Sequence, residues 1–156
     1  VDGELVEMPP EGQGHAINTG ETLLTLKSII RRMPGLEITS NMAIHLGAGR
    51  AVGPDAVIFE PDPARPSLTP ASGVKLAIEH AYSSRSYDLK RKARLYAEAG
   101  VPEYWVLDNV QPQLHRFHSP ADGVYQRAPP LGLDQTIALP FAPEERVRVG
   151  NLFRTN

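Results

Sequence analysis

The chain contains no cysteine among its 156 residues. This absence excludes a disulfide framework, a thiolate zinc site and a cysteine nucleophile, and it fits an intracellular, cytoplasmic location. No apolar run approaches the roughly 18 residues that a membrane-spanning helix needs, and no signal-peptide pattern stands at the start. We therefore expect no membrane partner. Because the first residue is Val1 instead of methionine, these expectations cover the given residues only.

A strong excess of either charge is also missing. Sixteen Lys and Arg stand against 18 Asp and Glu, for a formal net charge of -2. Such a chain does not bind nucleic acid through its overall charge, so a nucleic-acid site has to be a local cluster of basic residues. With 41% hydrophobic residues, this length is typical of one core. We predict a single domain over residues 1–156.

Hydrophobic periodicity predicts two helices. The first runs from His15 to Arg32, where a broad apolar stripe that includes Ile17 and Leu24 ends at Pro34-Gly35. The second runs from Ser86 to Ala99 and is followed by Gly100, a residue typical of the position after a helix.

Alternating or continuous apolar runs predict strands around these helices. The predicted strands span residues 4–8, 36–46, 52–59, 74–81, 103–108, 113–118, 123–127 and 136–139. Within 36–46, Asn41 is a candidate for a bulge or turn. Residues 119–122 are predicted to form the turn of a hairpin, and 60–73 a proline-rich connection. Strands mixed with two helices indicate an α/β or α+β sandwich.

Two carboxylates stand at strand ends. Asp55 follows Pro54 where an apolar strand begins, and Glu79 closes the alternating strand 74–81. Hard cations such as Mg²⁺ bind through one or two carboxylates and complete their shell with water and substrate phosphate. This order therefore favours a metal-dependent phosphodiesterase. The alternative is that both are ordinary surface carboxylates.

Lys92 is the candidate basic partner of this pair. The apolar stripe of the second helix is formed by Leu89, Ala93, Tyr96 and Ala97. At about 100° per residue Lys92 lies roughly 60° from Leu89, on the border of this stripe, so its side chain leans inward. The alternative is a solvated basic helix face from which Lys92 extends to water. Four further basic residues, suited to phosphate contacts, add positive charge: Arg85, Lys90, Arg91 and Arg94.

Nearly the whole chain resembles the Uma-type restriction endonuclease family, which is similar to PD-(D/E)XK nucleases. The segments that carry the resemblance are Gly3–Pro10, His15, Pro54-Asp55, Ile78-Glu79, Tyr87–Lys92 and Tyr96–Asp108. The most specific is an Asp-x-x-x-Lys-x-x-x-Tyr helix leading into Gly-Val-Pro-Glu-Tyr-Trp. The resemblance implies a restriction-endonuclease-like mixed central β-sheet flanked by helices. It also implies Mg²⁺ or Mn²⁺ held by Asp55 and Glu79, with the His80 carbonyl as a third ligand.

The resemblance also implies auxiliary roles for Glu4 and His15, although a histidine at a helix start is commonly a surface residue. Two departures weaken the match: Ala81 stands where the superfamily has lysine, and Tyr82 where many relatives have aspartate or serine. Alternation points the His80 side chain away from Glu79, which favours a core or supporting role for that side chain.

Four other residues carry less chemistry. His115 and His118 lie three apart on opposite faces of a predicted hairpin, which does not make a metal pair. Tyr104 and Trp105 are expected in the core.

Taken together, these features predict an Mg²⁺-dependent endonuclease that hydrolyses DNA, with Asp55, Glu79 and Lys92 at the reaction centre. Such an enzyme can act as a homodimer. A catalytically inactive nucleic-acid-binding or assembly module on the same fold is the alternative. That module would keep the basic helix and tolerate Ala81 and Tyr82.

Overall fold

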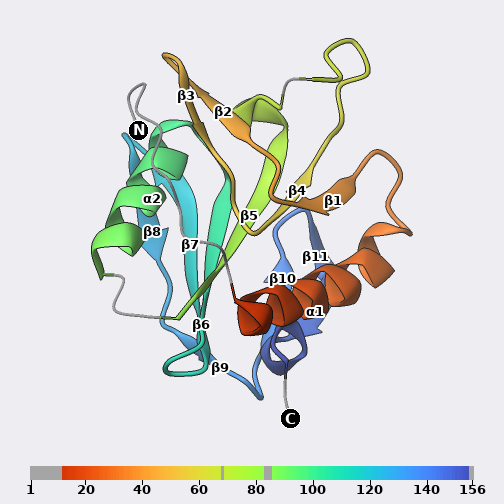
Figure 1. The fold of residues 1–156 in the computed structure, drawn as a ribbon, viewed down its shortest axis with the longest axis vertical. Coiled ribbons are helices and arrows are strands. Elements are labelled where there is room, and N and C mark those ends of the chain that lie inside the picture. Colours follow the sequence, from red (N-terminus) through yellow and green to blue (C-terminus); the bar gives the residue numbers. More distant parts are fainter. Residues whose placement is uncertain (1–11, 68, 83–85, 155–156) are drawn as a thin grey trace.

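A computed structural model describes residues 12–67, 69–82 and 86–154 of the chain (Figure 1). A central seven-stranded sheet has the order β1-β4-β5-β6-β7-β8, with β9 beside β7. Its strands are β1 (Glu37–Ser40), β4 (Ala56–Phe59), β5 (Val74–Ala81), β6 (Glu103–Asp108), β7 (Gln113–Ala121), β8 (Val124–Arg127) and β9 (Leu131–Gly132). This mixed sheet and its helices form the α+β architecture expected from the sequence.

One strand pair of the central sheet, β5 and β6, is parallel, and the remaining pairs are antiparallel. Parallel neighbours need a crossover connection, and helix α2 (Ser86–Glu98) provides it. Helix α2 ends where Gly100 takes a left-handed φ of 81°. The backbone N–H groups of Gly100 and Val101 bond the carbonyls of Ala97 and Tyr96 at 3.1 and 3.0 Å. This Schellman ending turns the chain directly into β6.

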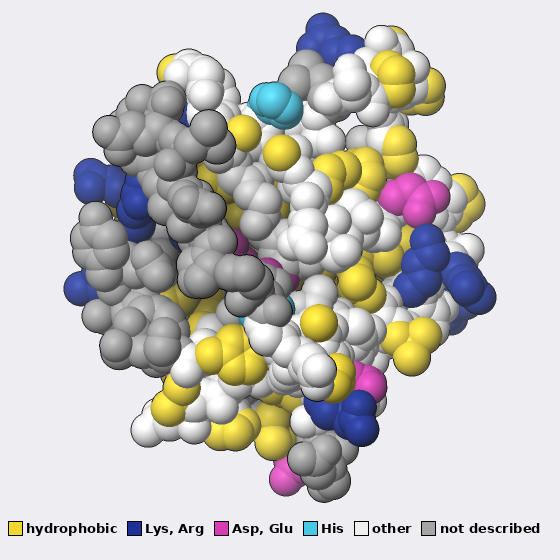
Figure 2. Space-filling model, in the orientation of Figure 1, with side chains coloured by type: hydrophobic (Ala, Val, Ile, Leu, Met, Phe, Trp, Pro, Cys, Tyr) yellow, Lys and Arg dark blue, Asp and Glu magenta, His cyan; other side chains and the backbone are white. Residues whose placement is uncertain are grey.

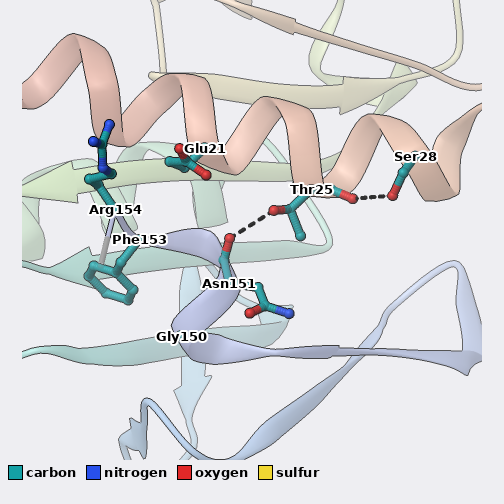
Figure 3. Close-up of a pocket in the computed structure, with 7 residues that line it drawn as sticks. All are labelled: Glu21, Thr25, Ser28, Gly150, Asn151, Phe153 and Arg154. Atoms are coloured by element: carbon teal, nitrogen blue, oxygen red, sulfur yellow. Dashed lines mark hydrogen bonds between the residues drawn. The ribbon is translucent and has the colours of Figure 1, made fainter. Parts of the chain in front are cut away.

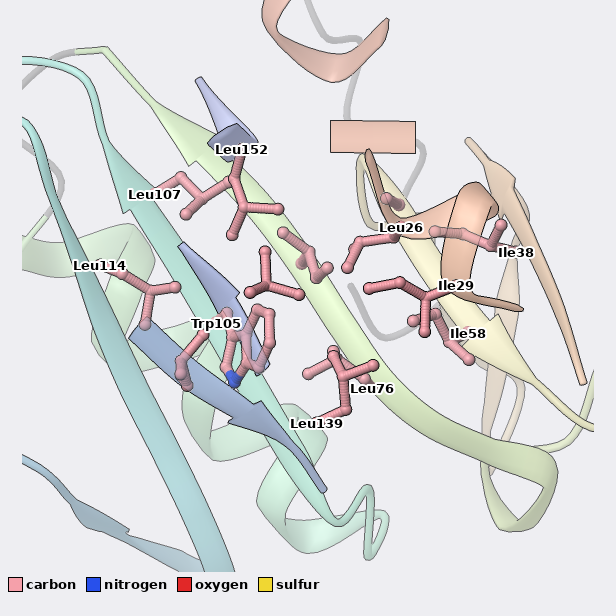
Figure 4. Packing of buried hydrophobic residues seen from close by; sticks show 14 of the residues in the cluster. Leu26, Ile29, Ile38, Ile58, Leu76, Trp105, Leu107, Leu114, Leu139 and Leu152 are labelled. Atoms are coloured by element: carbon pink, nitrogen blue, oxygen red, sulfur yellow. The ribbon is translucent and has the colours of Figure 1, made fainter. Parts of the chain in front are cut away.

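Helix α1 (Gln13–Ile30) covers the opposite face of the sheet from α2. It shares that face with the hairpin β10 (Thr136–Leu139) and β11 (Ala142–Arg148) and with the short 3-10 turn η2 (Val149–Leu152). Figure 4 shows Leu26 and Ile29 packing toward Leu76 and Ile58 there. Trp105 is fully buried in the same cluster, as the sequence predicted.

The face covered by α2 holds a second apolar cluster. Tyr96 of α2 and Tyr104 of β6 are both fully buried in it. The small hairpin β2 (Ile44–Gly47) and β3 (Arg50–Val52) closes the cluster through Ile44, and the short 3-10 turn η1 (Ala71–Gly73) precedes β5. Because side chains alternate along β5, Ile78 faces α1 while Ala77 faces α2.

Several sequence predictions of element boundaries were wrong. The strand expected over residues 36–46 is two strands, β1 and β2, separated at Asn41, which has a left-handed φ of 53°. The strand expected over 52–59 begins at Ala56, because Val52 ends β3 in the neighbouring hairpin. Hydrophobic spacing continues across both breaks and does not report them, whereas Asn41 was already a candidate turn residue for the first.

The hairpin turn was also misplaced. Strand β7 continues to Ala121, and the turn is Asp122-Gly123, with φ values of 52° and 74°. Positive φ at both central residues is the requirement of a type I′ turn, for which Asp-Gly is a favoured pair.

Strand β11, residues 142–148, was missed because its sequence, APEERVR, is largely polar. Two apolar residues assigned to the buried stripe of α1 are also exposed, since 43% of Ile17 and 72% of Leu24 is accessible. The strand predicted over residues 4–8 lies outside the described residues. No helix in the described ranges is long and apolar enough to cross a membrane.

Candidate active site

Asp55 and Glu79 stand at the adjoining ends of the two central strands β4 and β5. Ala56 pairs with Ile78 in the antiparallel ladder, so continuing the register sets Asp55 opposite Glu79. Opposed residues of such a pair project to one face, with Cβ atoms typically about 4.5–5.5 Å apart. Both residues are buried, with 9% and 8% exposure. Two carboxylates are therefore held side by side away from bulk water.

Asp55 is fixed from two directions. Its Oδ2 atom accepts a hydrogen bond of 2.8 Å from the backbone N–H of His80. Its Oδ1 atom lies 3.0 Å from Nε2 of His15, in the first turn of α1. The first contact ties Asp55 to the end of β5, and the second brings the start of α1 to the carboxylate pair.

Glu79 receives donors from the α2 side of the sheet. Lys92 Nζ lies 2.8 Å from Glu79 Oε2. The Tyr104 hydroxyl donates to the same oxygen at 3.1 Å, and the Tyr96 hydroxyl makes a long contact of 3.5 Å with Oε1. Helix α2 and strand β6 thus both converge on this side chain.

Burial dominates the electrostatics of Glu79. It raises the pKa of the carboxyl above its ordinary value; Lys92 opposes this shift and the charge of Asp55 adds to it. Burial, followed by the Glu79 charge, raises the pKa of Tyr96 and of Tyr104 well above 10. Both hydroxyls therefore stay protonated and act as donors. An added cation would favour the ionised carboxylates.

The His80 side chain is buried on the α1 face, opposite Glu79. Its Nε2 lies 2.8 Å from Thr22 Oγ1 and its Nδ1 lies 3.0 Å from Asn109 Nδ2. Burial, reinforced by nearby His15, lowers the pKa of His80 to about 4, so the ring is neutral near pH 7. The side chain is therefore a supporting group, and only the main-chain carbonyl of His80 remains as a candidate ligand.

The basic residues of α2 differ in exposure and in ion pairing. Lys90 and Arg94 are exposed and Arg91 is half-buried, while Arg94 Nε makes a 3.3 Å ion pair with Glu98. Figure 2 shows Lys and Arg in separate patches toward the edge of the visible face. Arg85 and the auxiliary candidate Glu4 lie outside the described residues.

The two departures from the nuclease motif lie next to the carboxylates. Ala81 is half-buried and Tyr82 is 40% exposed. The Tyr82 hydroxyl accepts a 2.9 Å hydrogen bond from Asn18 of α1, and its ring centroid lies 5.2 Å from that of His15. Tyr82 therefore lines the same end of the sheet as Asp55.

The donor set suits a hard cation. Within residues 12–67, 69–82 and 86–154, no three His, Asp or Glu side chains gather as a metal-binding group. The available donors are two buried carboxylates and main-chain oxygen, and Mg²⁺ commonly uses one or two carboxylates and retains water. Asp55, Glu79 and the His80 carbonyl therefore fit magnesium or manganese in ligand chemistry.

The sequence pattern predicts Tyr104 in the core and Tyr96 in the apolar stripe of the second helix, and it assigns neither residue to the site. Both are buried, as expected, but their hydroxyls also reach Glu79. A buried tyrosine hydroxyl normally requires a polar partner. Two core tyrosines near a strand-end glutamate were therefore the available signal.

A separate polar cleft of about 400 Å³ lies between α1 and η2 (Figure 3). Its lining is formed by Glu21, Thr25, Ser28, Gly150, Asn151, Phe153 and Arg154. None of these is a residue that the sequence nominated for the site.

The mixed central sheet and its flanking helices define a restriction-endonuclease-like fold class. The chain belongs to the Uma2 family, described as "Putative restriction endonuclease", whose model matches residues 1–149. Its fold is similar to the crystal structure of a "putative nuclease belonging to DUF820" from Anabaena variabilis. That similarity has a TM-score of 0.75 and 14% sequence identity, and covers 98% of this chain and 87% of the other. No curated protein matches the chain.

Proposed function

We propose that this protein is a Mg²⁺-dependent endonuclease that hydrolyses DNA phosphodiester bonds, with Mn²⁺ as a substitute cation. The observation that carries the proposal is the convergence of Asp55, Glu79 and Lys92, with Lys92 Nζ 2.8 Å from Glu79. Asp55, Glu79 and the His80 carbonyl are the proposed metal ligands. When bound, the cation would polarise the phosphate and lower the pKa of an attacking water.

The protein's own residues supply orientation and charge. Lys92 is the proposed partner of the negative charge that develops on the phosphate, because its ammonium group is held beside the carboxylate pair at a partly buried position. Tyr104 fixes the rotamer of Glu79 by donating to Oε2. His15, 3.0 Å from Asp55, is a proposed auxiliary group, as is Glu4.

The basic residues near α2 are proposed to guide the DNA backbone. Lys90, Arg91 and Arg94 would contribute sequence-independent phosphate contacts, and we extend the same role to Arg85. Each subunit is proposed to be a single domain over residues 1–156. A homodimer would favour cleavage of both strands, because each subunit would cut one strand. The absence of cysteine supports activity in the cytoplasm.

The second candidate function is an inactive nucleic-acid-binding or assembly module. Ala81 favours it, because the usual lysine of the nuclease motif is missing there. In this chain the Lys92 ammonium group approaches Glu79 from helix α2 instead, which supports the nuclease proposal. Cation binding separates the candidates: an inactive module has no requirement for a functional carboxylate pair.

The deciding experiment compares Asp55→Asn and Glu79→Gln with the unaltered protein. These substitutions preserve shape and remove charge, so both variants should lose most Mg²⁺- or Mn²⁺-dependent plasmid cleavage. Gel assays with each cation, and with chelator as the blank, would measure the loss. Glu144→Gln, at an exposed position of β11 on the opposite face of the sheet from α2, is the matched control and should cleave normally. Full cleavage by both site variants would exclude this reaction centre.

A further inference from the structure

A buried polar chain lies behind the carboxylate pair, on the α1 face of the sheet. Thr22 of α1 is 1% exposed and His80 is 7% exposed. Thr22 Oγ1 lies 2.8 Å from His80 Nε2 and 2.7 Å from the carbonyl oxygen of Leu152 in η2. Asn109, which follows β6, contacts the other ring nitrogen at 3.0 Å. Three segments distant in sequence therefore meet at one imidazole.

The partners determine which ring nitrogen carries the proton. Asn109 Nδ2 lies 3.1 Å from the Leu107 carbonyl, which can only accept, so the amide nitrogen is correctly oriented and its second hydrogen is donated to His80 Nδ1. Nε2 of the neutral ring then carries the hydrogen and donates to Thr22. Thr22 is left with its own hydrogen for a carbonyl oxygen, and the Leu152 carbonyl at 2.7 Å is nearer than the Asn18 carbonyl of the same helix at 3.2 Å. The hydrogen bonds run in one direction, from Asn109 to Leu152.

This chain is coupled to the residues that would hold the cation. His80 is bonded to Glu79 in sequence, and its backbone N–H donates to Asp55 at 2.8 Å. The backbone N–H of Asn109 donates to the Ala81 carbonyl at 2.8 Å. The end of β5 is thus restrained by Asp55 and Asn109 along the main chain and by Thr22 through the His80 ring.

An apolar residue at position 80 would fill the same space without polar partners. Burying polar groups is favourable only when each is bonded, so three mutually satisfied groups indicate a requirement for direction as well as volume. Hydrogen-bonded groups behind metal ligands fix the orientation of those ligands, and their loss typically weakens metal binding about 10- to 100-fold.

We propose that Thr22, His80 and Asn109 are positioning residues that hold the end of β5 so that Asp55, Glu79 and the His80 carbonyl share one cation. This inference rests on the proposed function. The side chains of these three residues act through the metal ligands and contact neither the substrate nor the reacting atoms.

The test is Mn²⁺ affinity of the full chain, measured by titration calorimetry beside thermal unfolding. Thr22→Val keeps the shape and removes the hydroxyl, and it should weaken Mn²⁺ binding about tenfold or more. Thr22→Ser restores the hydroxyl and should bind within about twofold of the unaltered protein.

Thr25 offers a matched control. It lies one turn along α1, and its hydroxyl donates to the Asn151 carbonyl at 2.8 Å (Figure 3), a bond between the same two elements as Thr22 to Leu152. Thr25→Val should lower the unfolding temperature by less than Thr22→Val, because Thr25 is only half-buried, and should leave Mn²⁺ affinity unchanged. Asn109→Ala provides a second route, because it removes the amide donor from His80 and should also weaken Mn²⁺ binding.

The outcomes distinguish the positioning role from the proposed function. Normal Mn²⁺ affinity in both Thr22→Val and Asn109→Ala would overturn the positioning role and leave the proposed function standing. Equal losses of Mn²⁺ affinity in Thr22→Val and Thr25→Val would have the same meaning. No Mn²⁺ binding by the unaltered protein would overturn the proposed function and the positioning role with it. If Thr22→Val does not fold, Asn109→Ala decides between these outcomes.

Discussion

Lys92 reaches Glu79 from the middle of helix α2, with 2.8 Å between its Nζ and the carboxylate Oε2. The nuclease motif more commonly places a lysine two positions after the glutamate, where this chain has Ala81. A residue on a helix and a residue on a strand are unrelated by local spacing. The crossover from β5 through α2 to β6 brings them together, because it packs α2 on the face toward which Glu79 points.

Replacement of Lys92 by methionine should slow cleavage by about 10²-fold or more, the scale seen when one preorganised electrostatic partner is removed. Methionine preserves much of the side-chain stem and removes the charge. Single-turnover cleavage at saturating DNA measures the effect. A loss no larger than that of a neighbouring solvent-facing cation would show that Lys92 is one more solvated charge.

Arg91→Met and Arg94→Met should weaken DNA binding modestly, with less effect at high salt. Each removes at most one phosphate contact, so the slope of log affinity against log salt should fall by about one. We expect the smaller loss at Arg94, because its ion pair with Glu98 already offsets its charge. Filter binding across a salt series, without divalent cation, gives the slopes. Unchanged slopes in both variants would remove α2 from the DNA-binding surface.

Tyr104→Phe should slow cleavage by about 10- to 100-fold, since a hydrogen bond to a charged group contributes about 1.5–3 kcal/mol. The change removes only the hydroxyl that donates to Glu79. Tyr125→Phe is the matched control: it loses a 2.7 Å hydrogen bond to the Val101 carbonyl and leaves Glu79 untouched. Comparable cleavage rates in the two variants would argue against a role for Tyr104 in the site.

Folding stability should fall as the pH is lowered from about 6.5 to about 4, in part because of His80. Its pKa is about 4 in the folded protein against 6.5 for an ordinary histidine. Between these values the unfolded chain binds more protons than the folded one, so protonation favours unfolding. A gap of this size corresponds to roughly 3 kcal/mol once both forms are titrated.

Urea unfolding at several pH values measures this dependence. His80→Gln should show a shallower loss of stability between pH 6.5 and 4 than the unaltered protein. His45→Gln, which removes an exposed histidine, should retain the full dependence. Parallel curves for all three proteins would contradict the assignment of the loss to His80.

The sequence by itself determined the elements that carry the site. Strand 74–81 and strand 103–108 match their predicted bounds, and helix α2 ends within one residue of its prediction, because alternation, a helical stripe and Gly100 are local signals. The positions of Asp55 and Glu79 at strand ends and the inward lean of Lys92 were also predicted, because strand and helix spacing are local signals.

Only the tertiary structure decided which partners meet. The membership of β1 and β2 in two different sheets, the contacts of the His80 ring with Thr22 and Asn109, and the approach of Tyr104 to Glu79 depend on contacts between distant segments. Periodicity reports which face of an element is apolar, and it carries no information on which other element covers that face. Thr22 and Asn109 lie 58 and 29 positions from His80, so the packing of α1 and the β6–β7 connection against β5 was needed to join them.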